Sequence, residues 1–242
     1  ATTKEENFTR IPRQEELKLT PGADYVHICF NNTIFGTKWD YIPETNGVPL
    51  VADMSSCILS EPVDVSKFGL IYAGAQKNVA PAGLTIVIVR EDLLREDLPS
   101  YVPTVCNYKV MADNDSMYNT PPCWPIYICK LVLEWIDSIG GLTALKEKNA
   151  KKAALLYDYL DNSRLFKNPV KPECRSMMNV TFRAEDDEIN AKFVKESSAA
   201  GMSNLKGHRS VGGMRASIYN AMPYEGVETL VEFMKKFEAE NL

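Results

Sequence analysis

The segment from Phe68 to Val89 constrains the fold most, because it contains two apolar runs joined by a turn with a single lysine. The first run, residues 68–73, ends in small residues, and the second covers residues 84–89. Short apolar runs bounded by glycine and proline are typical of buried β-strands. Small neighbours allow another group to approach Lys77 closely, and partial burial lowers the pKa of an ammonium. Lys77 is therefore a candidate Schiff-base lysine, although the local pattern alone also fits a solvated lysine in a turn.

Two earlier apolar runs also end in polar residues. Residues 24–30 lead into a pair of asparagines and Thr33, and residues 48–52 lead into Asp53 and two serines. The carboxyl ends of parallel strands lie along one edge of a sheet, where ligands usually bind. We therefore predict a buried, at least partly parallel sheet that is covered on both faces, with Thr33, Asp53 and Lys77 along one edge.

The second half of the chain predicts a smaller α+β unit. Residues 124–139 are apolar almost all round and predict a buried helix that ends at Gly140 and Gly141. After these glycines the pattern predicts alternating helices and strands, namely helices over 142–161, 185–200 and 225–239 and strands over 176–183 and 213–219. We place the domain boundary at the glycines, so that residues 1–139 form the first domain and residues 140–242 the second.

Composition excludes several classes of function. The net charge is −5 at pH 7 over 242 residues, and the longest basic cluster, at Lys146, Lys148, Lys151 and Lys152, is interleaved with alanines. This cluster predicts a solvated helix face rather than a nucleic-acid interface. No apolar run has the length of a membrane span. Six cysteines and two histidines lack metal-ligand spacing, so we expect no metal site and reduced cysteines in a cytoplasmic protein.

The segment 99–123 is rich in proline, asparagine, aspartate, serine and threonine and predicts a long loop. Loops of this length inside a compact protein usually serve a function or contact a partner.

Asp53 and Lys77 together match what a pyridoxal phosphate enzyme requires. The lysine forms the Schiff base, and the carboxylate keeps the pyridine nitrogen protonated so that the ring withdraws electrons. Hydrogen-bonding groups for the cofactor phosphate and ring hydroxyl are also needed. Thr33, Gln76 and the serines at 55 and 56 are of the right type.

A second group of candidate residues lies in the glycine-rich segment 205–217. Arg215 lies on the polar face of the predicted strand and is suited to a bidentate grip on a carboxylate. His208 and Arg209 precede it closely and could form an anion-binding surface with it. All three residues equally fit an ordinary protein surface.

Four stretches of the sequence resemble the phosphoserine aminotransferases, namely YAGAQKNVAPAGLTIVIVREDLL, VADMSSCILSEPVDVSKFG, MYNTPP and LKGHRSVGGMRASIYNAMP. The resemblance runs from Tyr25 to the C-terminus. It implies the α/β architecture of pyridoxal phosphate fold type I, in the class V aminotransferase group, with a mainly parallel sheet in a large domain and a smaller α+β C-terminal domain. It also implies a cytoplasmic homodimer that uses pyridoxal 5'-phosphate. The reaction implied transfers an amino group from L-glutamate to 3-phosphohydroxypyruvate in serine biosynthesis, giving O-phospho-L-serine and 2-oxoglutarate.

The resemblance assigns cofactor-binding roles to residues of the first domain. Lys77 matches the Schiff-base lysine, and Asp53 matches the partner of the pyridine nitrogen. Thr33 matches a residue that bonds the ring oxygen, and Gln76 one that bonds the cofactor phosphate. In the loop 113–120, Asn119 and Thr120 match residues that reach the partner subunit's cofactor phosphate.

For the substrate, the resemblance implies that Arg215 holds the α-carboxylate, and that His208 and Arg209 bind the phosphate of phosphoserine. The sequence departs from the family pattern in two places. Residues 31–33 read NNT, where the family usually has an acidic residue before the threonine. Family members are also longer at the N-terminus, in a part that carries an aromatic stacking residue and a cofactor-phosphate loop, so the large domain is expected to be incomplete.

Three alternatives follow from these patterns. The chain could be a catalytically silent fragment of such an enzyme, or a related fold-type I aminotransferase of the alanine–glyoxylate kind. It could also be a cysteine desulfurase, which requires a reactive cysteine on a mobile loop. Cys106, in the segment 99–123, is the one cysteine placed for that role.

Overall fold

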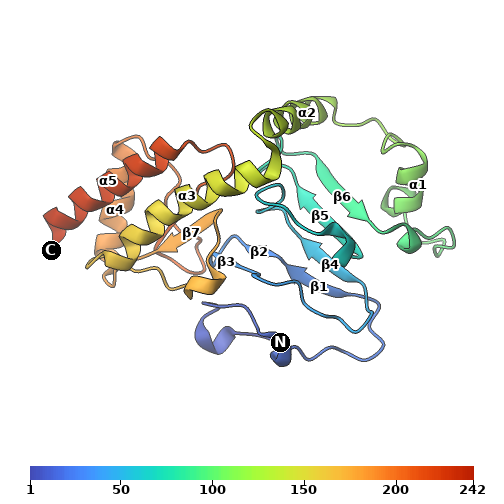
Figure 1. Ribbon diagram of the computed structural model, residues 1–242, viewed down its shortest axis with the longest axis horizontal. Coiled ribbons are helices and arrows are strands. Elements are labelled where there is room, and N and C mark those ends of the chain that lie inside the picture. The colour runs from blue at the N-terminus through green and yellow to red at the C-terminus, as the bar shows by residue number, and fades with distance from the viewer.

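A four-stranded sheet forms the centre of the first half of the computed structural model, which describes residues 1–242 (Figure 1). The strands lie in the order β1 (Val26–Cys29), β4 (Leu50–Asp53), β5 (Leu70–Gly74) and β6 (Thr85–Val89). β1, β4 and β5 run parallel, whereas β6 pairs antiparallel with β5. The predicted partly parallel sheet is confirmed. The C-terminal ends of its three parallel strands meet at one edge.

Only one face of this sheet is fully buried, so the prediction of a sheet covered on both faces is wrong for this chain. Side chains alternate between the faces, and the buried set comprises Ile28, Leu50, Ala52, Ile71 and Ala73. Residues between them, on the other face, are exposed or half-buried, namely His27, Cys29, Val51, Asp53 and Tyr72. The reason is that the longer helices pack chiefly against one another and against β7 rather than on this face.

A short hairpin, which the sequence did not predict, follows β1. It pairs β2 (Asn31–Asn32) with β3 (Thr37–Lys38), and its turn carries Thr33. The turn closes through Gly36, whose φ is +75° and where a Cβ atom would lie 2.8 Å from the carbonyl oxygen of Asn179. Glycine is therefore required both for the backbone conformation and for the close approach to β7.

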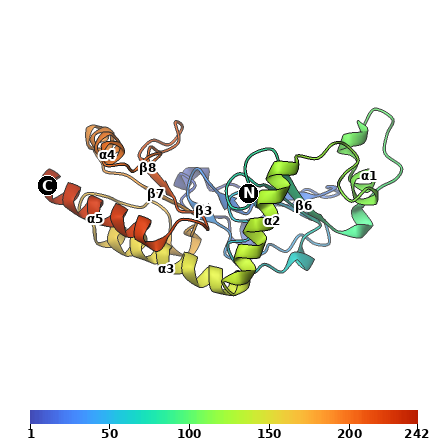
Figure 2. The same cartoon turned by 90° about the horizontal axis from the view of Figure 1, so that it is seen from above.

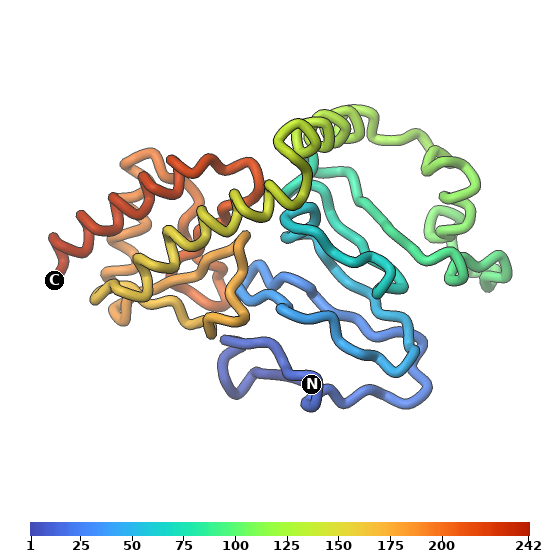
Figure 3. Tube along the Cα trace, in the orientation of Figure 1, coloured from blue at the N-terminus to red at the C-terminus, as the bar shows by residue number.

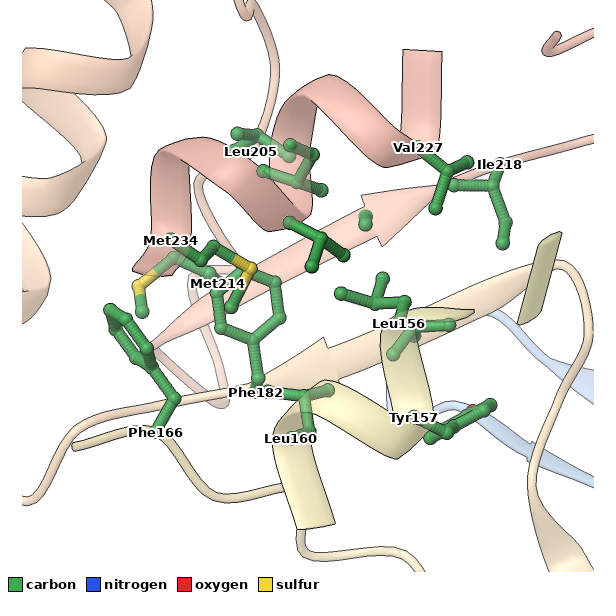
Figure 4. Close-up of a cluster of buried hydrophobic side chains, with 14 of the residues drawn as sticks. Leu156, Tyr157, Leu160, Phe166, Phe182, Leu205, Met214, Ile218, Val227 and Met234 are labelled. Atoms are coloured by element: carbon green, nitrogen blue, oxygen red, sulfur yellow. The ribbon is translucent and has the colours of Figure 1, made fainter. Parts of the chain in front are cut away.

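The second half folds as predicted, with alternating helices and strands. Its elements are α3 (Gly141–Asn162), β7 (Asn179–Phe182), α4 (Asp187–Ala199), β8 (Met214–Ser217) and α5 (Tyr224–Asn241). β7 and β8 pair antiparallel. The helices enclose an apolar core that includes Leu156, Phe182, Met214 and Met234 (Figure 4). Phe166 and Phe193 form an edge-to-face pair in this core, with ring centroids 5.1 Å apart.

Short helices occupy parts of the connecting segments. Six are single 3₁₀ turns, at Lys4–Glu6, Gln14–Glu16, Val65–Lys67, Glu91–Leu93, Thr104–Cys106 and Pro172–Cys174. The predicted loop 99–123 also contains α1 (Tyr108–Asp113), which Asn107 caps by accepting from the amide of Lys109 at 2.9 Å. The segment is therefore less irregular than predicted.

Helix α2 (Cys123–Ser138) is present where the sequence predicts it but is not buried. Ile136 is its only buried residue, and Trp124 and Tyr127 are 64% and 52% exposed. The apolar composition indicates a helix that packs on several sides, yet no other segment of the chain covers its outer face. Gly140, with φ of +101°, lies between α2 and α3, and Gly141, with φ of +74°, is the first residue of α3; the chain turns sharply here (Figure 3). None of the five α-helices combines the length and apolar composition needed to cross a bilayer.

The two lobes of the molecule, visible from above in Figure 2, have separate apolar cores. The chain nevertheless returns to the first core after α3, because Val170, Cys174 and Met178 are buried among residues of the sheet lobe. The division at residues 139 and 140 stays a prediction.

A buried polar network joins the hairpin to the second lobe. Asn31 and Asn179 are 1% and 0% exposed, and the Asn31 Nδ2 donates to Asn179 Oδ1 at 2.9 Å and to Ser56 Oγ at 2.8 Å. The Nδ2 of Asn179 donates to Tyr219 Oη at 3.1 Å. This network fixes the hairpin that carries Thr33 relative to strands β7 and β8.

Replacing Asn179 with alanine is expected to lower the free energy of unfolding by about 2–4 kcal/mol, because it leaves several buried polar groups without partners. Urea unfolding measures this loss. Asn162→Ala is the matched control, since Asn162 is exposed and its side chain donates only to Asp158 O. Equal losses in the two variants would contradict a structural role for the network.

Candidate active site

Lys77 lies in the turn that follows β5, and its Nζ donates to Thr33 Oγ1 at 2.9 Å. The turn is compact because the amides of Val79 and Ala80 both donate to Ala75 O at 3.0 Å. Strand β5 and the hairpin turn therefore hold the lysine side chain between them. The structure brings together two residues that are 44 positions apart in the sequence.

The half-buried position of Lys77 changes its acid–base behaviour. Burial lowers the pKa of its ammonium, and the nearby Asp53 carboxylate partly opposes this effect. The charge of Arg215 lowers the pKa of Lys77 further. A larger fraction of the side chain is therefore present as the nucleophilic amine near neutral pH than in an exposed lysine.

Asp53 is the last residue of β4, and its Oδ1 accepts from the backbone amide of Ser55 at 2.8 Å. The register places Cys29 of β1 and Tyr72 of β5 on either side of it. Burial raises the pKa of Tyr72, and the charge of Asp53 raises it further. His27 Nε2 and Tyr72 Oη lie 3.1 Å apart. These neighbours were not among the predicted site residues, although strand alternation and the parallel order would have placed them on the face that carries Asp53.

The other predicted cofactor donors differ in their availability. Gln76 is exposed and folds back over Gly74, where a Cβ atom would lie 2.6 Å from Gln76 Oε1. Ser55 Oγ accepts from the amide of Gly74 at 3.0 Å. Ser56 is 3% exposed, and its hydroxyl donates to the carbonyl of Asn31 and accepts from the side-chain amide of the same residue. Ser56 therefore belongs to the buried network and is not free to bind a ligand.

Arg215 lies on β8 and reaches the turn of the hairpin. Its Nη1 donates to the carbonyl oxygen of Thr33 at 3.3 Å, while its buried Nε has no hydrogen-bond partner. Thr33 therefore connects the two cations, because its hydroxyl accepts from Lys77 and its carbonyl accepts from Arg215. An unpaired, buried guanidinium nitrogen is a donor suited to an anionic ligand.

A pocket of about 410 Å³ lies beside Arg215. His208, Arg183 and Phe35 also line it, and His208 Nδ1 lies 2.7 Å from Ser210 Oγ. Arg209 is exposed and does not line this pocket. The structure therefore brings His208 and Arg215 together but leaves Arg209 at the surface.

Asn119 and Thr120 are exposed in the segment between α1 and α2, and their one hydrogen bond joins Asn119 Nδ2 to Thr120 O at 3.3 Å. They form no hydrogen bond with Lys77, Asp53 or Thr33. Cys106 is also exposed, in the single 3₁₀ turn Thr104–Cys106. The cysteines that lie near Lys77 are Cys29 and Cys57, so nothing in the structure favours a role for Cys106 beside the lysine.

Comparison with known proteins relates this arrangement to a family. The sequence matches the family model described as aminotransferase class-V over residues 2–230. Phosphoserine aminotransferase of Bacillus cereus is 56% identical over 241 residues, which are 100% of this chain and 67% of that protein.

Solved structures give the same result. Phosphoserine aminotransferase from Bacillus circulans subsp. alkalophilus superposes with a TM-score of 0.96 at 47% identity, covering 99% of this chain and 66% of that chain. The pyridoxal phosphate-bound phosphoserine aminotransferase from Trichomonas vaginalis gives 0.90 at 40% identity, covering 95% and 65%. The chain thus spans about two thirds of the length of these relatives.

Proposed function

The chain belongs to the class V aminotransferase family, and from this premise we propose that it acts as a pyridoxal phosphate-dependent phosphoserine aminotransferase. The reaction proposed is amino transfer from L-glutamate to 3-phosphohydroxypyruvate, which gives O-phospho-L-serine and 2-oxoglutarate. The observation that carries the proposal is the bridge at Thr33, which joins a half-buried lysine beside a carboxylate to an arginine with an unpaired buried nitrogen.

The residues present fit pyridoxal phosphate by their chemistry. Lys77 offers an amine whose only hydrogen-bond partner is a neutral hydroxyl, and Asp53 offers a carboxylate oriented by a backbone amide. We assign the ring nitrogen to Asp53, the ring oxygen to Thr33 and the phosphate to Gln76. When bound, the cofactor supplies an aldehyde that condenses with amines and a ring that withdraws electrons from the substrate α-carbon.

The protein residues then provide proton transfer and charge stabilisation. Lys77 Nζ, once free, takes the proton from the substrate α-carbon as a general base and later returns a proton as a general acid. The lowered pKa of Lys77 supports this role, because the amine must be unprotonated when it takes the proton from the α-carbon. The fixed negative charge of Asp53 favours a proton on the group that it faces and so stabilises charge that develops during the reaction.

The substrate is held by the cationic groups of the second lobe. We assign the α-carboxylate to Arg215, whose Nε is free to donate. The phosphate is assigned to His208 and Arg209, of which His208 lines the pocket beside Arg215 and Arg209 lies exposed next to it in the sequence. A phosphate needs several donors, so these residues would distinguish a phosphorylated substrate from an unphosphorylated one.

We also propose that the protein is a cytoplasmic homodimer in which the loop 113–120 of one subunit approaches the site of the other. Support comes from the exposure of Asn119 and Thr120 together with large apolar residues around them, since a contiguous exposed apolar surface marks an interaction site. Met117, Tyr118 and Trp124 are 61%, 49% and 64% exposed. A reducing compartment suits the six free cysteines.

The test of substrate class compares amino donors. We expect O-phosphoserine to be used far better than serine, alanine or cysteine, and His208→Ala to lower kcat/KM for O-phosphoserine by about 10- to 100-fold, the usual effect of losing a hydrogen bond to a charged group. The same variant should leave the rate with alanine unchanged. Lys206→Ala is the matched control, since Lys206 is exposed in the same segment. A preference for cysteine or alanine over O-phosphoserine would instead favour a desulfurase or an alanine–glyoxylate type of aminotransferase.

A further inference from the structure

Lys152 is a buried lysine that forms no ion pair, although its sequence neighbourhood predicts a solvated helix face. It lies on α3 and is 3% exposed. Its Nζ donates to four backbone carbonyl oxygens, those of Ile218 at 3.2 Å, Tyr219 at 2.9 Å, Asn220 at 3.3 Å and Met222 at 2.9 Å. An ammonium has three N–H groups, so these carbonyls satisfy it completely. Burial lowers the pKa of Lys152 to about 8.

The four carbonyls belong to the segment 218–222, which follows directly on β8 and its Arg215. Neutral carbonyls that converge on one point repel one another unless a cation lies between them. The ammonium of Lys152 therefore determines the shape of this segment. The segment carries no regular secondary structure of its own.

Asn220, in the middle of the segment, reaches the sheet lobe. It is 5% exposed, its backbone amide donates to Asn78 Oδ1 at 3.1 Å, and its Nδ2 donates to Leu59 O at 2.9 Å. Its Oδ1 accepts from Asn149 Nδ2 of α3 at 2.9 Å. The shape of the segment thus decides where these groups of Asn220 meet the sheet lobe.

Asn78 follows Lys77 in the sequence and is 7% exposed. Its Oδ1 accepts from Asn220, and its Nδ2 donates to Ile58 O at 3.0 Å. Both ends of the Asn78 amide are therefore fixed. The backbone that carries Lys77 is fixed with them.

We propose that Lys152 is a positioning residue for Lys77. It shapes the segment 218–222 so that Asn220 holds Asn78 and, through it, the turn that presents the lysine. The inference rests on the proposed function, because that function gives Lys77 its chemistry. The chain of contacts from Lys152 to Lys77 does not depend on the cofactor. It links a helix of the second lobe to the reactive amine of the first.

The test replaces Lys152 with methionine, which keeps most of the side-chain length and removes the donors. Lys151→Met is the matched control, because Lys151 is the neighbouring lysine on the same helix and is exposed. The full chain is incubated with pyridoxal phosphate and borohydride, and the mass increment on the Lys77 peptide is followed with time. We expect the labelling rate to fall about tenfold or more in Lys152→Met, since small misplacements of a reacting group have effects of this size, and to stay unchanged in Lys151→Met.

Two further measurements separate positioning from a general loss of stability. Amide hydrogen exchange over residues 75–80 should rise in Lys152→Met but not in Lys151→Met, with or without pyridoxal phosphate. A double variant tests the path itself. In a chain that already carries Asn78→Ser, which removes the last contact of the path to Lys77, adding Lys152→Met should slow labelling no further, because the effects of residues that act through one path are not additive. Asn78→Ser also tests the link by itself if Lys152→Met fails to fold.

The outcomes are distinct for the two proposals. Absence of label on Lys77 in the wild-type chain would count against the proposed function, and hydrogen exchange would then decide on Lys152 alone. Equal labelling and equal exchange over residues 75–80 in Lys152→Met and Lys151→Met would overturn the positioning role. Additive losses in the double variant would overturn it as well.

Discussion

Replacing Lys77 with alanine is expected to abolish amino transfer and to remove the borohydride-reducible attachment of pyridoxal phosphate. Both effects follow from one side chain. In the proposed mechanism its amine is the nucleophile for the cofactor aldehyde, and the same amine moves the proton at the substrate α-carbon. General acid–base catalysis alone contributes about 10²–10⁴-fold, so with the attachment also lost we expect turnover to fall by about 10⁴-fold or more.

The measurement combines turnover with mass analysis of the reduced protein. Lys67→Ala is the control, because Lys67 is exposed at the end of the turn Val65–Lys67, outside the site. The fold should survive in Lys77→Ala, since Lys77 makes one side-chain hydrogen bond and is only half-buried. Turnover that persists in Lys77→Ala, or label that remains on another lysine of this variant, would remove Lys77 from the mechanism.

Replacing Asp53 with asparagine should lower kcat by about 10²–10³-fold, the range found when a group that stabilises transition-state charge is removed. The substitution keeps the shape of the side chain, and its amide oxygen still accepts from the amide of Ser55. The change is therefore mainly one of charge. We expect stability to change little, because most substitutions that leave packing and hydrogen bonds in place have small effects.

The same variant has a pH consequence with a definite sign. The Asp53 carboxylate raises the pKa of Lys77 against the lowering effect of burial. Without this carboxylate, the pKa of Lys77 should fall further. In a plot of the Lys77 labelling rate against pH, the rising limb should therefore move to lower pH. Asp40→Asn is the control, since Asp40 is exposed and is not among the groups that act on Lys77. A limb that moves to higher pH, or moves equally in both variants, would show that Asp53 does not act on this lysine.

The sequence predicts the strands of the sheet and the positions of Asp53 and Lys77 at the carboxyl ends of β4 and β5, because both depend on simple patterns. Apolar runs bounded by turn residues mark strands, and parallel strands place their ends at one edge. The sequence predicts the position of Thr33 but not the hairpin that carries it, because strands of two residues leave almost no periodic pattern.

Other features depend on contacts between distant parts of the chain and could not be predicted. Asn31 and Asn179 form one hydrogen bond across 148 positions, and an asparagine in a sequence gives no sign of its partner. The pattern around Lys152 predicts a solvated face of four lysines, because helical position does not reveal which of them meets converging carbonyls. Helix α2 was predicted to be buried from its composition, but composition shows that a surface needs a partner and not that the same chain provides it.

The return of the chain from α3 to the sheet lobe has a consequence for biosynthesis. Val170, Cys174 and Met178 complete the apolar core around the sheet, so the nascent chain lacks part of this core until those residues have left the ribosome. Domains generally fold as units in the order of their synthesis, but here the sheet that presents Lys77 must wait for residues made long after it. Until then the growing chain exposes apolar strands, a condition in which incompletely folded chains are prone to aggregate.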